Sequence, residues 1–307
     1  MTAVLRIGTR GSRLALAQAE WARRRLEAAD AGLRAELVVI KTSGDSLRDV
    51  PLHQVGGKGL FVKELESALR EGAIDCAVHS LKDLPGELAP GLTIAAVPER
   101  EDPHDVAITR AAGGLAALPH GARIGTSSPR RAALVRMLWP DLTVVALRGN
   151  VDTRLAKLER GEVDGIILAA AGLHRLGVTP AHVEPCDADE FVPAIGQGAL
   201  ALESRAEPLA ERLAVIEHRP TRDAIDAERA FLRAVGGTCV SPLAAHATVA
   251  DGRLRLRALI AHPDGTRVVR GDATGTSADA ARVGRELAER LLRDGGAALL
   301  RSLGMPA

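Results

Sequence analysis

The residues best suited to chemistry stand at the end of a short apolar run, in the segment HSLKD (residues 79–83). The run before them, residues 74–78, is bounded by polar residues, which is typical of a buried strand. Pro85 prevents the strand from continuing. An ammonium (Lys82) and a carboxylate (Asp83) at the exit of a strand lie where open α/β sheets bind their ligands. The alternative is that the two form a solvated surface pair, which stabilises little.

Arginines form the second group, because most of them fall at expected strand exits or in the first turn of a helix. These are Arg10, Arg130, Arg131, Arg148 and Arg154, with Arg175 as a weaker member after a short turn. Loops at such places face the cleft of an α/β lobe, and helix N-termini there add N–H donors for anions. Further hydroxyl donors are Ser12, Thr126, Ser127 and Ser128. Arginine suits planar carboxylates, which it grips with two N–H groups, so the pattern predicts a ligand with several carboxylates.

Pairing with surface Asp or Glu is the alternative interpretation for some of these arginines. We do not extend it to Arg130 and Arg131, because two adjacent cations repel each other unless an anion lies beside them. We expect the ligand to supply that anion.

Spacing excludes several other kinds of site. The segment GGKG (residues 56–59) lacks the GxxxxGK[ST] spacing of a phosphate loop, and Gly59 stands where the metal-binding hydroxyl would be. The nine histidines show no HExxH spacing, and no GxSxG segment is present. We therefore expect neither a nucleotide site nor a hydrolase nor a metal site.

The three cysteines are widely spaced and odd in number, so we expect no structural disulfide and no zinc. Cys76 lies in the expected strand and is predicted to be a core residue. Cys186 is surrounded by acidic residues in EPCDADE, which should raise its pKa and make it inert. Cys239 stands in the glycine-rich segment GGTCVSP, and composition alone leaves it undecided between a reactive and a structural thiol.

The composition of the 307-residue chain is that of an ordinary globular protein, with 46% hydrophobic and 26% charged residues. A net charge of +1, 2% aromatic residues and no tyrosine argue against a stacking surface for nucleic acid. No run approaches the ~20 apolar residues of a membrane span, and the N-terminus shows no secretory signal. We expect a cytoplasmic protein that binds neither nucleic acid nor membrane.

The order of the elements predicts an α/β fold. Strands are expected at residues 4–8, 35–40, 74–78, 92–97, 122–125, 142–146, 165–170 and 200–204, and helices at 12–29, 60–70, 151–160 and from 128. The charged, Pro-bounded segment 98–103 is predicted to be a hinge into a second lobe, and the turn PAIGQG (residues 193–198) precedes the return strand. This pattern indicates two periplasmic-binding-protein-like α/β lobes around a central cleft.

A third, smaller domain is expected at the C-terminal end. A long helix from about residue 221 to 235 precedes strands at 243–249, 253–261 and 267–271 and a helix from 277, which indicates an α+β domain with an antiparallel sheet. The predicted domains are residues 1–98 with 200–217, residues 99–199, and residues 218–307.

The segment VHSLKDLP (residues 78–85) also resembles the signature of the porphobilinogen deaminase family, the hydroxymethylbilane synthases. Further matches follow the family's order: IGTRGS with LALAQ (7–18), TSGD (42–45), GGKGLFVKELE (56–66), GTSSPRR (125–131), LRGNVDTRL (147–155), PAIGQGAL (193–200) and GGTCVSP (236–242). The resemblance extends over nearly the whole chain.

The resemblance implies an enzyme that joins four porphobilinogen molecules head to tail into hydroxymethylbilane, primed by a dipyrromethane cofactor on Cys239. The implied cofactor-binding residues are Cys239, Ser12, Ser80, Lys82, Asp83, Thr126, Ser127, Ser128, Arg130, Arg131, Arg154 and Gly172. The implied substrate-binding residues are Arg10, Lys58, Phe61, Arg148, Arg154, Arg175 and Gln197. A monomer without a metal is expected.

The chemistry of this reaction suits the residues. Each porphobilinogen carries an acetate and a propionate, so the growing chain gains two negative charges per ring, which the arginines match. Loss of ammonia leaves an azafulvene cation, and a fixed carboxylate near the pyrrole N–H stabilises it. Asp83 is the predicted catalytic carboxylate, with Asp45 as the next candidate and Ser80 and Gln197 as supporting residues.

The rival hypothesis is a bilobal anion-binding protein without catalysis. It accounts for two lobes and for the arginines. It leaves Asp83 unexplained, since a carboxylate would weaken anion binding, and it gives Cys239 no role.

Overall fold

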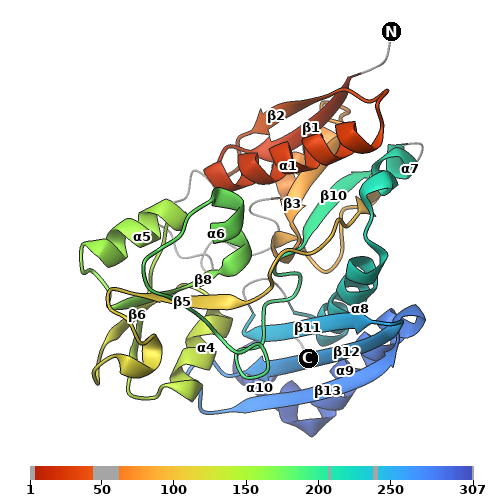
Figure 1. The fold of residues 1–307 in the computed structure, drawn as a ribbon. Helices are drawn as coiled ribbons and strands as arrows, with labels where there is room; N and C mark the ends of the chain where they lie inside the picture. The colour runs from red at the N-terminus through yellow and green to blue at the C-terminus, as the bar shows by residue number, and fades with distance from the viewer. Residues whose placement is uncertain (1–3, 44–61, 207–208, 238–240, 306–307) are drawn as a thin grey trace.

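The computed structural model describes residues 4–43, 62–206, 209–237 and 241–305, and these contain three sheets (Figure 1). Two are five-stranded and mixed, and the third is a smaller antiparallel sheet of three strands, which confirms the predicted fold class. The domain boundaries stay a prediction. The predicted site residues Lys58, Phe61 and Cys239, together with Asp45, lie outside the described residues.

The first sheet has the strand order β2-β1-β3-β10-β4. Its strands are β1 (Leu5–Arg10), β2 (Ala35–Ile40), β3 (Cys76–Ser80), β4 (Leu92–Ala96) and β10 (Leu200–Arg205). β1 is parallel to β2 and β3, whereas β10 is antiparallel to β3 and β4. Helices α1 (Arg13–Ala29) and α3 (Lys63–Arg70) cover opposite faces of this sheet, and α7 (Leu209–Leu213) packs with α1.

The second sheet has the order β7-β6-β8-β5-β9. Its strands are β5 (Asp105–Thr109), β6 (Arg123–Gly125), β7 (Thr143–Val145), β8 (Gly165–Ala169) and β9 (Val183–Pro185). Its helices are α4 (Pro129–Leu138), α5 (Val151–Glu159) and α6 (Ala170–Leu176). Serines cap two of the helices at their N-termini: Ser12 accepts a hydrogen bond from the N–H of Ala15, and Ser128 accepts one from the N–H of Arg131.

The sequence did not predict β5, β9 or α6. β5 is fully buried and antiparallel to β8 and β9, with Asp105 as its first residue. Asp105 follows a charged segment bounded by prolines, and this composition is typical of a loop. The strand could therefore not be predicted from the sequence. In the structure Asp105 has buried cationic partners, which permit a charged residue inside the sheet.

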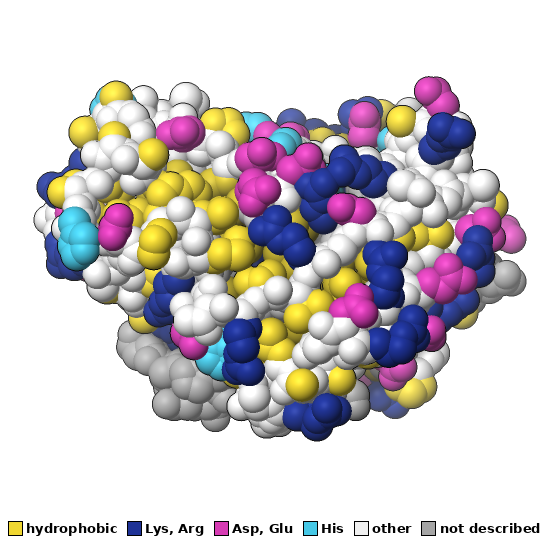
Figure 2. Space-filling model, turned by 90° about the horizontal axis from the view of Figure 1, so that it is seen from below, with side chains coloured by type: hydrophobic (Ala, Val, Ile, Leu, Met, Phe, Trp, Pro, Cys, Tyr) yellow, Lys and Arg dark blue, Asp and Glu magenta, His cyan; other side chains and the backbone are white. Residues whose placement is uncertain are grey.

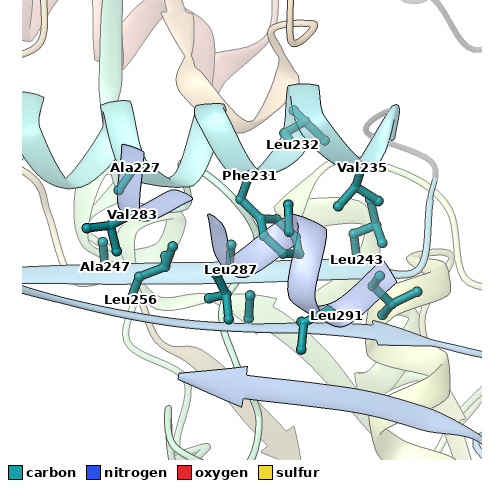
Figure 3. Close-up of a cluster of buried hydrophobic side chains, with 14 of the residues drawn as sticks. Ala227, Phe231, Leu232, Val235, Leu243, Ala247, Leu256, Val283, Leu287 and Leu291 are labelled. Atoms are coloured by element: carbon teal, nitrogen blue, oxygen red, sulfur yellow. The ribbon is translucent and has the colours of Figure 1, made fainter. Parts of the chain in front are cut away.

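The third sheet is made of β11 (Leu243–Ala250), β12 (Arg253–Ala261) and β13 (Val268–Thr276), so β13 extends beyond the predicted strand. Helices α8 (Arg219–Val235) and α9 (Ala280–Leu291) cover one face, and α10 (Ala297–Ser302) follows. Figure 3 shows Phe231 of α8 and Leu287 of α9 directed toward the strands, and both belong to the apolar core of this domain. The remaining short helical segments are η1 (Leu81–Asp83), η2 (Leu115–Ala117), η3 (Ala214–Ile216), η4 (Ser277–Asp279) and η5 (Leu292–Gly296).

The underside of the molecule carries basic and acidic side chains intermixed (Figure 2), which agrees with the net charge of +1. On this face the drawn side chains form no uniformly basic surface of the kind that binds nucleic acid. Among the described helices, none has the length and apolar character that crossing a bilayer requires.

The chain crosses between the first two sheets twice: the first crossing follows β4 and the second precedes β10. One residue of α8 forms hydrogen bonds to both crossings. The side chain of Glu228 has no exposed surface and accepts hydrogen bonds from Arg100 Nη1 (2.6 Å), the N–H of Gly196 (2.7 Å) and the N–H of Ala247 (2.8 Å). Arg100 lies in the first crossing and Gly196 in the second. Because the carboxylate is desolvated and fully bonded, both crossings depend on its charge.

We therefore predict that Glu228→Gln lowers the free energy of unfolding by about 3 kcal/mol, since it leaves the buried Arg100 without a counter-charge. The matched control is Glu286→Gln, at an exposed ion pair with Arg282, which should change stability by less than about 1 kcal/mol. Urea denaturation of both variants measures the difference. Equal effects would show that the buried pair has no special weight.

Candidate functional site

A cavity of about 170 Å³ lies between the first two sheets. The first sheet and α1 contribute Leu14, Gln18, Ser80 and Lys82, the second sheet and its helices contribute Arg131, Arg154, Gly172 and Arg175, and the second crossing contributes Gly196 and Gly198. Four of the lining residues are cations, and no described lining residue is acidic. The cavity is therefore strongly electropositive and suits an anionic ligand.

The end of β3 presents the predicted motif to this cavity. Ser80 is the last residue of the strand, and its hydroxyl lies 2.8 Å from Nε2 of the buried Gln18. Leu81 is 1% exposed and donates its N–H to the carbonyl of Ala199 at 3.0 Å. This anchored leucine fixes η1, so that Lys82 and Asp83 are held half-buried at the strand exit.

Lys82 lines the cavity and also binds the second crossing, where its Nζ donates to Gln197 Oε1 at 3.3 Å. Burial lowers the pKa of Lys82 to about 8, and the neighbouring charge of Arg131 acts in the same direction. Lys82 is therefore charged below about pH 8 and adds there to the positive charge that lines the cavity. A bound carboxylate would favour the protonated lysine.

Asp83 follows Lys82 directly but does not line this cavity. Within the part of the chain that the structure describes, no hydrogen bond or ion pair of its carboxylate is formed. Its acceptor oxygens are therefore available to a donor on a ligand.

From the sequence, a protein carboxylate was excluded as the partner of Arg130 and Arg131, and the ligand was expected to supply the anion. That exclusion is wrong. Asp105 lies between them, 2.7 Å from Arg130 Nη1 and 2.7 Å from Arg131 Nη2, and all three side chains are buried. The two arginines hold the pKa of Asp105 at about 2, against the effect of its burial. One carboxylate partners two guanidinium groups, so a positive charge remains, and Arg131 still lines the cavity.

Arg154 and Arg175 approach from α5 and α6. Arg154 Nε donates to the carbonyl of Gly149 at 2.8 Å, and Arg175 Nη2 donates to the carbonyl of Gly198 at 2.7 Å. Burial lowers the pKa of each to about 10, with Arg131 as a further cause for Arg154. Both stay charged at neutral pH and face the same space.

Other predicted residues lie around this centre without lining the cavity. Gln197 is fully buried, and its Nε2 donates to the carbonyl of Pro103 at 2.8 Å. Ser127 donates to the carbonyl of Leu147, and Thr126 accepts from the N–H of Ser128. Ser12, Arg10 and Arg148 do not line the cavity either. Their roles in binding stay predictions.

Two polar residues of the site were missed. Gln18 and Asp105 are both buried beside predicted site residues, one bonded to Ser80 and the other to Arg130 and Arg131. The signal for Gln18 was its place one helical turn after Leu14, on the face of α1 that meets the cavity. No local signal marked Asp105.

The two described cysteines are both free and buried. The prediction that Cys76 belongs to the core is confirmed, since it is 0% exposed. Cys186 has its pKa raised to about 12, but the cause is burial first and Asp105 second. The predicted cause, its acidic sequence neighbours, is therefore wrong. The described residues contain no cluster of His, Cys, Asp and Glu that could hold a metal ion.

Fold and site together define a class: a bilobal α/β protein whose interlobe cavity is lined by four cations and suits an anionic ligand. Comparison with known proteins narrows this class. Residues 5–211 match the family model "Porphobilinogen deaminase, dipyromethane cofactor binding domain", and residues 223–293 match "Porphobilinogen deaminase, C-terminal domain".

Curated relatives agree over nearly the full length. The porphobilinogen deaminase of Syntrophobacter fumaroxidans is 48% identical over 98% of this chain and 98% of its own. Those of Syntrophotalea carbinolica (50% identical, 98% of this chain and 96% of that one) and Trichlorobacter lovleyi (51%, 96% and 95%) are similar. The chain belongs to the porphobilinogen deaminase family.

It is accordingly a transferase of tetrapyrrole biosynthesis that condenses four porphobilinogen molecules into hydroxymethylbilane, with a dipyrromethane cofactor. Between the two predicted functions, family membership decides for the enzyme. Among solved structures, the methionine-binding protein MetQ has a TM-score of 0.42 and 14% identity, covering 68% of this chain and 87% of that chain. At that score the fold assignment rests on the strand orders given above.

The charge on Asp105 gives a pH-dependent prediction. Its folded pKa of about 2 lies below the ordinary 3.8, so its contribution is complete above about pH 4 and is lost as the pH falls toward 2. The contribution is on the order of 2 kcal/mol. Asp105→Asn should be destabilised at pH 7, and its difference from wild type in unfolding free energy should shrink between pH 4 and pH 2.

The control for this experiment is Asp141→Asn, at an exposed position whose loss should leave the pH dependence unchanged. A constant gap between wild type and Asp105→Asn across this pH range would contradict the assignment.

Proposed function

We propose that the cavity between the two α/β sheets holds the growing pyrrole chain by its acetate and propionate groups. The observation that carries the proposal is the set of four cations, Lys82, Arg131, Arg154 and Arg175, that line one cavity with no described acid among them. Charge-assisted hydrogen bonds from guanidinium groups to carboxylates are among the strongest that proteins form. Ser80 and the backbone of Gly172 offer neutral contacts beside them.

The dipyrromethane cofactor fits this donor set, because its pyrroles carry the same acidic side chains as the substrate. We propose attachment through Cys239, with Lys82, Arg130, Arg131, Arg154 and Ser128 as the residues that hold its carboxylates. Bound there, it supplies a pyrrole with a free α-carbon to accept each new unit. Ser12, Thr126 and Ser127 belong to this proposed set, although their hydroxyls bond within the protein.

Asp83 is the proposed catalytic carboxylate. The C–N bond of the aminomethyl group breaks, ammonia leaves, and the substrate becomes a cation whose CH₂ is attacked by the α-carbon of the preceding pyrrole. A new C–C bond forms, and the attacking ring, which now carries the positive charge, then loses its α-proton to solvent. Asp83 is half-buried and its carboxylate forms no hydrogen bond with a described residue, so it can accept the pyrrole N–H and balance each cationic stage. Arg10, Arg148, Arg175, Gln197, Lys58 and Phe61 are the proposed residues for substrate.

We further propose that the chain acts as a cytoplasmic monomer without nucleic acid or metal, and that it is organised in the three domains predicted from its sequence. The support for the domains is that each contains one of the three sheets. The support for a monomer is that cations of one chain already line the cavity.

The attachment of the cofactor gives the first functional prediction. Freshly purified wild-type protein should carry a covalent adduct with the mass of two linked pyrroles, and Cys239→Ala should carry none. Cys186→Ala is the matched control, because that thiol is buried and its high pKa makes it a poor nucleophile. An active wild-type sample of unmodified mass would exclude the attachment.

The role of Asp83 gives the second. Asp83→Asn keeps the shape and removes the negative charge, so the rate should fall ~10²–10³-fold with the fold retained. Glu87→Gln, an exposed loss of the same charge four residues later, is the control. Rates should be compared on protein whose adduct has been verified by mass. Turnover within a few-fold of wild type would make Asp45 the next candidate.

A further inference from the structure

A second cavity of about 60 Å³ lies beside the first and is lined from all three sheets. Lys82 and Leu84 come from the first, Ser128 and Arg130 from the second, and Arg229, Ser241 and Leu243 from α8 and the start of β11. Lys82 lines both cavities. The space is large enough for a few water molecules or for one carboxylate-bearing side chain.

Arg229 is a cation of this cavity that forms no ion pair with a residue the structure describes. It is 5% exposed, and its Nη2 donates to the carbonyl of Gly86 at 3.0 Å. Its Nη1 is buried and has no hydrogen-bond partner among the residues that the structure describes. Asp226 and Glu203 are near enough to influence it, yet neither forms an ion pair with it in the described part of the chain.

Such an arrangement is unfavourable without a ligand. A buried cation with an unmet N–H loses the solvation that water would provide and gains no counter-charge in return. Burial accordingly lowers the pKa of Arg229 to about 10, and the charge of Arg233 lowers it further. The group stays charged at neutral pH, so its position suits an anion that arrives from outside.

The neighbours of Arg229 have the same preference. Arg130 shares the single carboxylate of Asp105 with Arg131, so that cluster keeps an excess positive charge. Ser128 and Ser241 add hydroxyl groups, and no described residue that lines the cavity is acidic. Guanidinium, ammonium and hydroxyl donors around a small space are complementary to a carboxylate.

We propose that Arg229 is a carboxylate-binding residue, and that the second cavity receives one acidic side chain of the covalently attached pyrrole. This inference rests on the proposed function, because Ser241 stands two residues after the proposed attachment residue Cys239. It makes α8, an element of the third sheet's core, part of the ligand site. Binding of the pyrrole would then tie all three sheets together through Lys82, Arg130 and Arg229.

The test compares Arg229→Gln and Arg229→Lys with Arg233→Gln, which removes an exposed arginine one turn along the same helix. Each protein is produced in cells that make no porphobilinogen, and the adduct is then formed by adding porphobilinogen and followed by intact mass. We expect Arg229→Gln to form the adduct at least tenfold more slowly, Arg229→Lys to be intermediate, and Arg233→Gln to match wild type.

Thermal unfolding provides a readout that a purely structural arginine would not change. The adduct should raise the Tm of wild type and Arg233→Gln by the same amount, and it should raise that of Arg229→Gln by less. If Arg229→Gln is too unstable to purify, Arg229→Lys, which keeps the charge without the planar fork, carries the same comparison.

Two outcomes would overturn the inference, and they are distinguishable. An Arg229→Gln protein that forms the adduct at the wild-type rate, with its Tm lowered equally with and without adduct, would show that Arg229 only fixes the loop at Gly86. Absence of any adduct from wild type and Arg233→Gln would instead refute the proposed attachment, and the inference would fall with it.

Discussion

The architecture of the site depends on one buried carboxylate, Asp105, held between two adjacent guanidinium groups. Arg130 and Arg131 stand in the first turn of α4, where the helix dipole disfavours positive charge. Their repulsion would drive the turn apart without an anion from another element, and β5 supplies it. Each arginine then faces a different cavity, Arg131 the first and Arg130 the second. Asp105 therefore holds one arginine in the wall of each cavity.

A second chain of buried polar contacts leads from the third sheet to the same place. Glu228 of α8 binds Arg100 and the N–H of Gly196, and Arg100 Nε donates to the carbonyl of Gln197 at 2.7 Å. The side chain of Gln197 then joins Lys82 to the carbonyl of Pro103. Glu228 and Gln197 are fully buried, so a shift at one end of this chain of hydrogen bonds changes the geometry of the next bond. The position of Lys82 thus depends partly on the third domain. The connection is indirect, because it runs from Glu228 through Arg100 and Gln197.

Local signals in the sequence predicted what is locally determined. The helices predicted from residues 12 and 128 begin there, because Ser12 and Ser128 cap them through residues three positions further along. The sequence also predicted which cations come together, since Lys82, Arg131, Arg154 and Arg175 line one cavity. The partner of Arg130 and Arg131 could not be predicted from the sequence. Asp105 is remote from both in the chain, and it is the charged first residue of a buried strand. Gln18 was missed for a similar reason, since its contact with Ser80 joins residues 62 positions apart.

The number of cations limits how the growing chain can be held. Each pyrrole ring carries two carboxylates, so the four cations of the first cavity match two rings. A chain of four rings carries more negative charge than this cavity can neutralise, and buried unpaired carboxylates are strongly unfavourable. Longer chains must therefore place their remaining carboxylates in solvent or against cations outside the first cavity, such as Arg10 and Arg148. Asp83 stays at the strand exit throughout, because Leu81 is buried and bonded to Ala199. With Asp83 in its proposed catalytic role, elongation requires the bound chain to move past this single carboxylate, so that the balance between cations and carboxylates changes with each ring added.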